Sequence, residues 1–210
     1  MQLKRLFVAL GAGYFVGTFP TADLIARRVS AGTVDLRLSG TGNPGGANVL
    51  GLLGTKAGYT VMAGDIAKGA LASALGGFIA GPNGAHAAGS GSVIGHCLPV
   101  WTRFRGGKGV AASIGQCLVT FPAYFPVDLA VAAATAASPR LKQRAFMATM
   151  ASSVAWVLGG LLWWRKGWSN LWGPRPGLGL PVAAAVSSAT IAYKFLSAVS
   201  PPPSPTVVTR

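Results

Sequence analysis

Two glycine-rich polar stretches interrupt an otherwise apolar chain, and they hold most of the residues that could bind a substrate. The first covers residues 39–48 and reads SGTGNPGGAN, and the second covers residues 105–109 and reads RGGKG. Glycine-rich loops expose backbone N–H groups, and several such groups that converge on one point bind anions. Lys108 adds a positive charge just before an apolar helical pattern begins. The two stretches therefore predict a phosphate-binding site.

The first stretch also carries side chains that could contact a substrate directly. Thr41, Asn43 and Asn48 have hydrogen-bonding groups, and Gly42 and Gly45 let the backbone turn without a Cβ clash. A plain turn between helices is the alternative, because Gly, Asn and Pro are common in turns.

The second stretch differs from a nucleotide-binding P-loop, because a glycine rather than Ser or Thr follows its lysine. Its candidate anion donors are the N–H groups of Gly106, Gly107 and Gly109. A basic cytoplasmic turn is the alternative interpretation.

Three ionisable residues elsewhere in the chain are further candidates. His96 lies twelve residues before the lysine of the second stretch and could act as a base or donor. Asp65 and Lys68 are spaced i, i+3 in an apolar segment, so they share a helix face and can pair. Ionisable residues at membrane depth are candidates for function. A structural histidine and a structural ion pair beneath the site are the alternatives.

The acidic and cysteine content argues against a metal site. The chain has four Asp and no Glu, which argues against a cage of several carboxylates. Cys97 and Cys117 lack a CxxC spacing, and we interpret them as reduced packing residues.

The composition is that of a membrane protein. Of the 210 residues, 51% are hydrophobic and 10% are charged, against about 25% charged in a typical soluble domain. The formal net charge of +14 could attract nucleic acid, but the apolar composition argues against a soluble nucleic-acid binder. Basic loops on the cytoplasmic side of a membrane explain the charge instead.

The apolar segments predict an all-α, polytopic integral membrane protein with about seven transmembrane helices, five or six being the alternatives. We expect one membrane-embedded domain over residues 1–200, a retained first span rather than a signal peptide, and a disordered Pro-rich tail over residues 201–210. No internal repeat supports a transporter. The expected spans are 6–25, 57–80, 85–101, 110–137 divided in two by Pro122 and Pro126, 146–164 and 180–199.

The distribution of Lys and Arg predicts the orientation. Twelve of these residues fall on the side of the two glycine-rich stretches, and five fall on the other side. Because positive charge accumulates in cytoplasmic loops, we expect cytoplasmic glycine-rich stretches and an external N-terminus.

Four blocks of this chain, taken together, resemble the bacterial acyl-phosphate:glycerol-3-phosphate acyltransferase family (PlsY). They are residues 17–21, 35–50, 65–69 and 95–110, which read GTFPT, DLRLSGTGNPGGANVL, DIAKG and GHCLPVWTRFRGGKGV. The resemblance implies a multi-pass enzyme of the bacterial inner membrane that takes part in phospholipid biosynthesis. It would transfer a fatty acyl group from acyl phosphate to the 1-hydroxyl of glycerol 3-phosphate and give lysophosphatidic acid and phosphate. It implies no cofactor and no obligate protein partner.

The resemblance also implies roles for the candidate residues. One phosphate would bind at Lys108 and the glycines around it, and the first stretch with Arg37 would bind the other phosphate or the oxyanion. The base would be His96 or a phosphate oxygen of the substrate. The expected catalytic residues are Lys108, His96, Thr41 and Asn48. The expected binding residues are Arg37, Gly42, Asn43, Gly45, Gly106, Gly107, Gly109, Asp65 and Lys68.

The chain departs from the family pattern at several positions. The family usually has Ser at Thr41, Thr at Ala47 and Arg at Gly51. A third family motif near the C-terminus, His-Arg-x-Asn, is absent, and Lys194 stands near its expected place. These departures favour one alternative, a non-catalytic or repurposed membrane homologue that binds a lipid or phosphate ligand.

Overall fold

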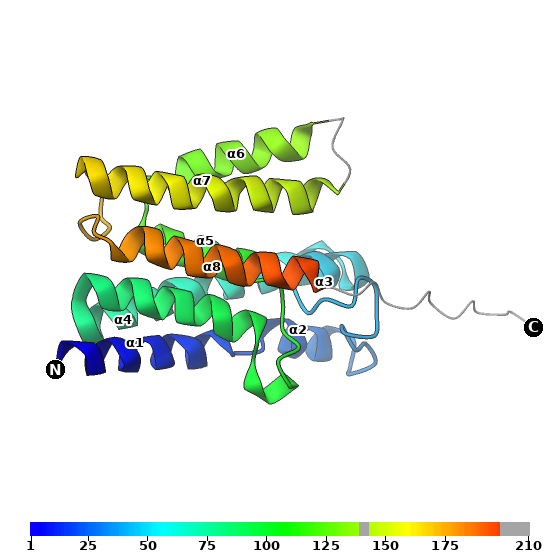
Figure 1. Cartoon of the computed structure of the whole chain (residues 1–210). Coiled ribbons are helices and arrows are strands. Elements are labelled where there is room, and N and C mark those ends of the chain that lie inside the picture. Colours follow the sequence, from blue (N-terminus) through cyan, green and yellow to red (C-terminus); the bar gives the residue numbers. More distant parts are fainter. Residues whose placement is uncertain (139–142, 198–210) are drawn as a thin grey trace, which may run out of the picture.

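The computed structural model describes residues 1–138 and 143–197, and every regular element within them is a helix (Figure 1). The elements are α1 (Gln2–Gly17), α2 (Thr21–Val29), α3 (Gly46–Leu53), α4 (Thr55–Cys97), the 3-10 turn η1 (Val100–Thr102), α5 (Val110–Thr120), α6 (Phe125–Ala137), α7 (Arg144–Lys166) and α8 (Gly179–Leu196). The prediction of an all-α fold is confirmed.

Helix α4 folds back on itself and forms two antiparallel arms. Ala80 and Gly81 leave helical geometry, with Gly81 at φ 65° and ψ −156°, a conformation that suits glycine, and Pro82 follows. The two arms then approach closely, because a Cβ on Gly76 would overlap the carbonyl oxygen of Gly84. This reversal brings the two ends of α4 to the same side of the molecule (Figure 1).

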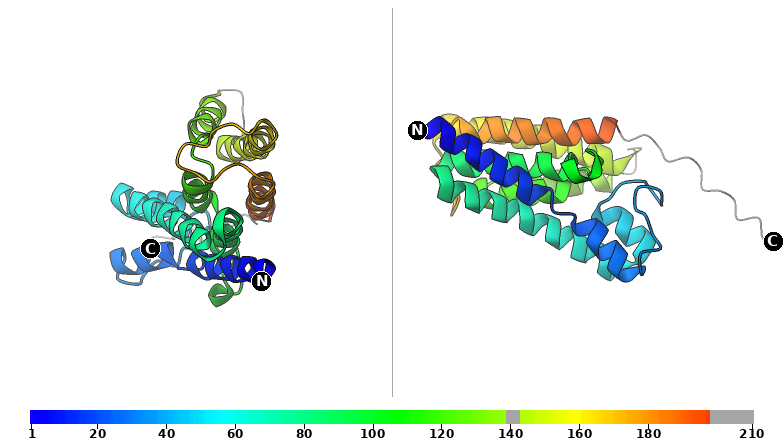
Figure 2. Two further views of the ribbon diagram at one scale, coloured as in Figure 1. Left: turned by 90° about the vertical axis from the view of Figure 1, so that its left-hand side faces the viewer. Right: turned by 90° about the horizontal axis from the view of Figure 1, so that it is seen from below.

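The helices fit the predicted integral membrane fold. Three helical stretches are long and apolar enough to cross a membrane: Gln2–Val29, Arg144–Lys166 and Gly179–Leu196. The two arms of α4 and the shorter helices α5 and α6 complete seven antiparallel segments within the described ranges. Figure 2 shows α5 and α8 between the group α1–α4 and the pair α6 and α7.

Several expected boundaries were wrong. The first span, expected as one helix over 6–25, breaks between α1 and α2, since Pro20 lacks the N–H that a continuous helix needs. A short helix, α3, lies between the expected spans 6–25 and 57–80, and the span expected over 85–101 stops as a helix at Cys97.

Small residues hold α1 against the second arm of α4. A Cβ on Gly13 would overlap the carbonyl of Ala88, and a Cβ on Gly17 would overlap that of Ser92. Small residues spaced four apart allow such close helix packing within membranes. This packing fixes the C-terminal end of α1 beside the C-terminal end of α4.

A buried polar cluster ties α8 to α4 and α5. The Ser187 hydroxyl donates to Gln116 Oε1 over 2.7 Å, and Gln116 Nε2 donates to Ser90 Oγ over 3.4 Å. All three side chains are buried. Because an unpaired polar group is costly in an apolar interior, these bonds fix the orientation of α8.

The two glycine-rich stretches lie toward the same side of the molecule, and the N-terminus lies at the opposite end (Figure 1). This arrangement agrees with the charge count, while the assignment of that side to the cytoplasm stays a prediction. Arg140, Lys142 and the predicted tail at 201–210 lie outside the described residues.

Candidate functional site

A pocket of about 120 Å³ opens where the α1–α2 break, α4 and the segment after α4 meet. We call it the polar pocket. Of the residues predicted for the site, it is lined by Arg37, Asp65, Lys68, His96, Gly106 and Gly107. Segments far apart in the sequence therefore bring these six residues together.

A buried ion pair with a histidine beside it forms one wall of the polar pocket. Lys68 Nζ lies 2.9 Å from Asp65 Oδ1 and also donates to the Phe19 carbonyl over 3.0 Å. His96 Nδ1 lies 3.6 Å from the same Asp65 oxygen, slightly beyond hydrogen-bond length. The three side chains are at most 7% exposed, so this charged group is shielded from water.

The other imidazole nitrogen of His96 faces the second glycine-rich stretch. A Cβ on Gly107 would overlap His96 Nε2, so only glycine permits this approach. The N–H groups of Gly106 and Gly107 donate to the carbonyls of Cys97 and His96, over 3.2 and 3.1 Å. They cap the end of α4, so the expectation that these two groups offer free anion donors was wrong.

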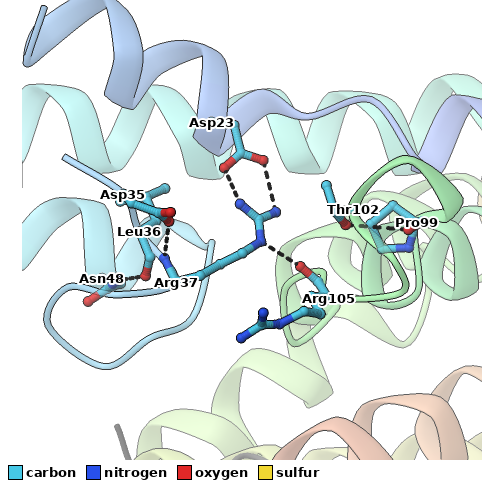
Figure 3. Close-up of polar contacts among 8 residues, drawn as sticks. All are labelled: Asp23, Asp35, Leu36, Arg37, Asn48, Pro99, Thr102 and Arg105. Carbon is cyan, nitrogen blue, oxygen red and sulfur yellow. Dashed lines mark hydrogen bonds and ion pairs between the residues drawn. The ribbon is translucent and has the colours of Figure 1, made fainter. Parts of the chain in front are cut away.

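Arg37 lines the polar pocket, and Figure 3 shows its guanidinium between Asp23 and the backbone of Arg105. Its guanidinium binds Asp23 in a bidentate manner, over 2.6 and 3.0 Å, and its Nε donates to the Arg105 carbonyl over 3.0 Å. The backbone N–H of Arg37 donates to the side chain of Asp35. Asp23 is in the first turn of α2, where the helix dipole favours a carboxylate. Arg37 thus joins α2, the first stretch and the second stretch.

Asn48 holds the first stretch together instead of reaching the pocket. Its Oδ1 accepts from the Thr41 N–H over 2.8 Å, and its Nδ2 donates to the carbonyls of Leu36 and Ser39 over 3.2 and 3.1 Å. The side chain is buried, and these partners are all backbone groups. Thr41 is exposed and does not line the pocket. The structure therefore gives Asn48 a positioning role and provides no contact for the expected catalytic role of either residue.

Other predicted residues also lie away from the polar pocket. Gly42, Asn43 and Gly45 do not line it; the first stretch reaches it through Pro44, and Arg37, just before the stretch, also lines it. Pro44 lies between Asn43 and Gly45, so the local fold of the stretch turns Pro44 toward the pocket and its two neighbours away from it.

Lys108 is oriented toward α8. Its Nζ lies 4.2 Å from the centre of the Phe195 ring, a cation–π contact. Partial burial lowers the pKa of the Lys108 ammonium below its ordinary value. Gly109, at φ 86°, turns the chain into α5 and packs against Val93, Cys97 and Ile191. The lysine therefore lies beside the polar pocket without lining it.

The sequence prediction missed the α1–α2 break as part of the site. Thr18, Thr21 and Asp23 line the polar pocket, and the Thr21 hydroxyl is buried without a hydrogen-bond partner in the described part of the chain. Trp101 Nε1 donates to Thr18 Oγ1 over 3.0 Å, which holds the segment after α4 against α1. The signal was Pro20 inside an apolar segment, because proline marks a helix break.

The polar pocket contains one histidine and two carboxylates, but they do not form a metal-binding cluster. Within residues 1–138 and 143–197, no three His, Cys, Asp or Glu side chains are placed to hold a metal ion.

Comparison with known proteins gives one consistent family. The family model described as glycerol-3-phosphate acyltransferase matches residues 7–200. A glycerol-3-phosphate acyltransferase of Bradyrhizobium diazoefficiens is 46% identical over 116 residues, which cover 54% of this chain and 57% of that protein. One of Maricaulis maris is 36% identical over 168 residues, covering 78% and 74%. The match thus spans little more than half the length of the Bradyrhizobium protein.

Two crystal structures of PlsY (YgiH), an integral membrane glycerol 3-phosphate acyltransferase, share the fold. The glycerol 3-phosphate form has a TM-score of 0.68 and 25% identity, covering 93% of this chain and 88% of that chain. The lysophosphatidic acid form has a TM-score of 0.69 and 26% identity, covering 91% and 88%.

Proposed function

Because the chain belongs to the glycerol-3-phosphate acyltransferase family, we propose that it is a membrane enzyme that acylates the 1-hydroxyl of glycerol 3-phosphate. The donor is acyl phosphate, and the products are lysophosphatidic acid and inorganic phosphate. The single observation that carries the proposal is the polar pocket, in which Asp65, Lys68 and His96 face Gly107 and Arg37.

His96 is the proposed base. The substrate hydroxyl gives its proton to Nε2 while its oxygen forms a bond to the acyl carbonyl carbon. The bond between the acyl carbon and the bridging phosphate oxygen then breaks, and the phosphate leaves with that electron pair. Asp65 orients the imidazole through Nδ1, and the 3.6 Å contact shortens to a hydrogen bond in the substrate complex. A phosphate oxygen of the substrate is the other candidate base.

Two cations bind the phosphate groups in this proposal. The Arg37 guanidinium matches a phosphate in a bidentate manner, and glycerol 3-phosphate takes the place of the Asp23 carboxylate. Lys108 binds the acyl phosphate at the start of α5. The acyl-phosphate group is a mixed anhydride with a good leaving group, so positioning and charge stabilisation suffice without a metal.

The site faces the cytoplasm in this proposal, because basic loops stay on that side of a bacterial inner membrane. Water-soluble glycerol 3-phosphate then enters from the cytoplasm, and the acyl phosphate and the lipid product move within the bilayer. The proposal needs no further protein partner.

The proposal is tested with purified protein in phospholipid vesicles that receive acyl phosphate and glycerol 3-phosphate. We expect lysophosphatidic acid and phosphate in equal amounts, a His96→Gln variant about 10²- to 10⁴-fold slower, and a Lys108→Ala variant that loses most turnover. Lys56→Ala, which removes an exposed cation on the same side, is the matched control. No lysophosphatidic acid above that of empty vesicles would refute the proposal.

The absence of Arg at position 51 and of the third family motif favours one other function, a homologue that binds a phosphate or lipid ligand without turnover. Binding of glycerol 3-phosphate to the same vesicles, with no product formed, would support that function.

A further inference from the structure

A second cavity, of about 150 Å³, lies between α5, α6, α7 and α8. We call it the apolar cavity. The residues that carry the argument are Val110, Ser113 and Cys117 on α5, Asp128 on α6, Trp156 on α7 and Ile191 on α8. Most of the cavity wall is hydrocarbon, so its polar groups require an explanation.

The apolar cavity begins next to the proposed reaction centre. Val110 comes two residues after Lys108, and Ile191 packs against Gly109. Gly106 and Gly107 line the polar pocket, whereas Val110 lines the apolar cavity. A hydrocarbon chain attached to a phosphate at Lys108 could therefore extend directly into the apolar cavity.

The far end of the apolar cavity lies at membrane depth. Helix α5 has 11 residues and is about 16 Å long, half of a bilayer core of about 30 Å. The turn into α6 is therefore well inside the membrane, short of the end that α7 reaches (Figure 1). The loop after α7 covers this turn, because Asn170 donates to the Thr120 carbonyl and Trp172 donates to the Leu118 carbonyl.

Asp128 is a carboxylate within this apolar region. The ion pairs among the described residues involve Asp23 and Asp65, and no cation pairs with Asp128. Its carbonyl accepts a bond from the Ser152 hydroxyl over 3.4 Å. An intramembrane carboxylate is costly, so it is expected to serve binding or catalysis.

Trp156 is a second polar residue in the wall of the apolar cavity. The residue is 6% exposed, and its Nε1 is buried without a hydrogen-bond partner in the described part of the chain. Trp156 follows Ser152 by one helical turn of α7, and both residues line the apolar cavity together with Asp128. One acceptor and one unused donor therefore border the same cavity.

The chemistry of this pair indicates a hydroxyl group. A hydroxyl can donate to the Asp128 carboxylate and accept from the Trp156 N–H. An ammonium has no acceptor for the indole, and a ketone has no proton for the carboxylate. A plain methylene chain would leave both groups unpaired.

We propose that the apolar cavity binds an acyl chain that carries a hydroxyl group near its middle, and that Asp128 and Trp156 hold this hydroxyl. The proposal rests on the proposed acyl transfer, with the hydroxylated chain as part of the donor. The mid-chain position of the hydroxyl follows from the length of the cavity along α5, since Cys117 lies about 10 Å beyond Val110 along this helix.

The test compares three acyl phosphates of equal length: one with a hydroxyl near mid-chain, one with a hydroxyl next to the carbonyl, and one without. We expect the mid-chain donor to have the highest kcat/KM, by about 10- to 100-fold. Asp128→Leu and Trp156→Phe should remove this preference and leave the unsubstituted donor active. Thr149→Val is the matched control, because that hydroxyl lines the cavity but already donates to the Ala145 carbonyl.

A binding measurement separates this proposal from the proposed function. The free mid-chain hydroxy acid and the unsubstituted acid are titrated into the protein in vesicles, and Asp128→Leu should abolish the difference in Kd. A difference in Kd between the two acids in the parent protein, without any turnover of the acyl phosphates, would refute acyl transfer but support the hydroxyl site. Equal Kd and equal kcat/KM for all donors, unchanged in Asp128→Leu, would overturn the site. A preference for a hydroxylated bilayer lipid over the donor would overturn the assignment to the acyl chain.

Discussion

Removal of one partner of the Asp65–Lys68 pair is the sharpest test of how the polar pocket is built. Replacing Asp65 with Leu leaves the Lys68 ammonium buried, with the Phe19 carbonyl as its remaining partner. Replacing Lys68 with Met in the same chain removes the stranded charge. The difference in stability between the single and double variants separates the cost of an unpaired buried charge from the cost of changed packing.

The magnitude follows from the geometry. At 2.9 Å and an effective dielectric constant of about 20, the attraction is about 6 kcal/mol, and desolvation of both charges offsets most of it. Removing one partner of a buried pair costs about 3–5 kcal/mol, whereas replacing both with apolar residues is close to neutral. At about 2–4 °C per kcal/mol, Asp65→Leu should lower the unfolding temperature by about 6–20 °C. The Asp65→Leu/Lys68→Met variant should recover most of that loss.

The assay is thermal unfolding of the purified proteins in one detergent, with acyl transfer measured in parallel. The double variant should be stable but inactive, since His96 has lost the carboxylate beside it. A single variant as stable as the parent, or a double variant no more stable than the single, would show that the charges do not pair in the membrane and would refute this reasoning.

Three further predictions concern glycine packing and buried amides. Gly107→Ala should reduce kcat on the order of 100-fold, because the added Cβ displaces His96. Gly177→Ala is the control and should match the parent, because the space around Gly177 is open. Equal rates for the two variants would contradict the contact between Gly107 and His96. Asn48→Ala should lower the free energy of unfolding by about 2–4 kcal/mol, because the side chain loses three hydrogen bonds to the backbone. Denaturant unfolding measures this loss. An unchanged midpoint would show that the first stretch does not depend on these bonds. Asn170→Ala should cost about 1–3 kcal/mol, because a carbonyl at the end of α5 loses its donor; a thermal scan identical to the parent would exclude this cap.

Local patterns predicted the part of the site that lies within one helix. The i, i+3 spacing predicted the contact between Asp65 and Lys68, which the structure confirms. The spacing could not show that Arg37 binds Asp23 and the Arg105 carbonyl, because those contacts join three segments. It also could not show that the N–H groups of Gly106 and Gly107 cap α4, since glycine content does not specify a hydrogen-bond partner.

Hydropathy and helical periodicity were enough to predict the membrane-embedded all-α fold, because both are properties of contiguous residues. The sequence also determined the family, through four polar blocks in a fixed order. Which of those residues contact one another depends on how the helices pack. His96 reaches Asp65 because α4 folds at Gly81, and Lys108 lies on Phe195 because the buried cluster of Gln116 fixes α8. Contacts between helices depend on close packing at glycines and on buried hydrogen bonds, and neither has a pattern that can be read along the chain.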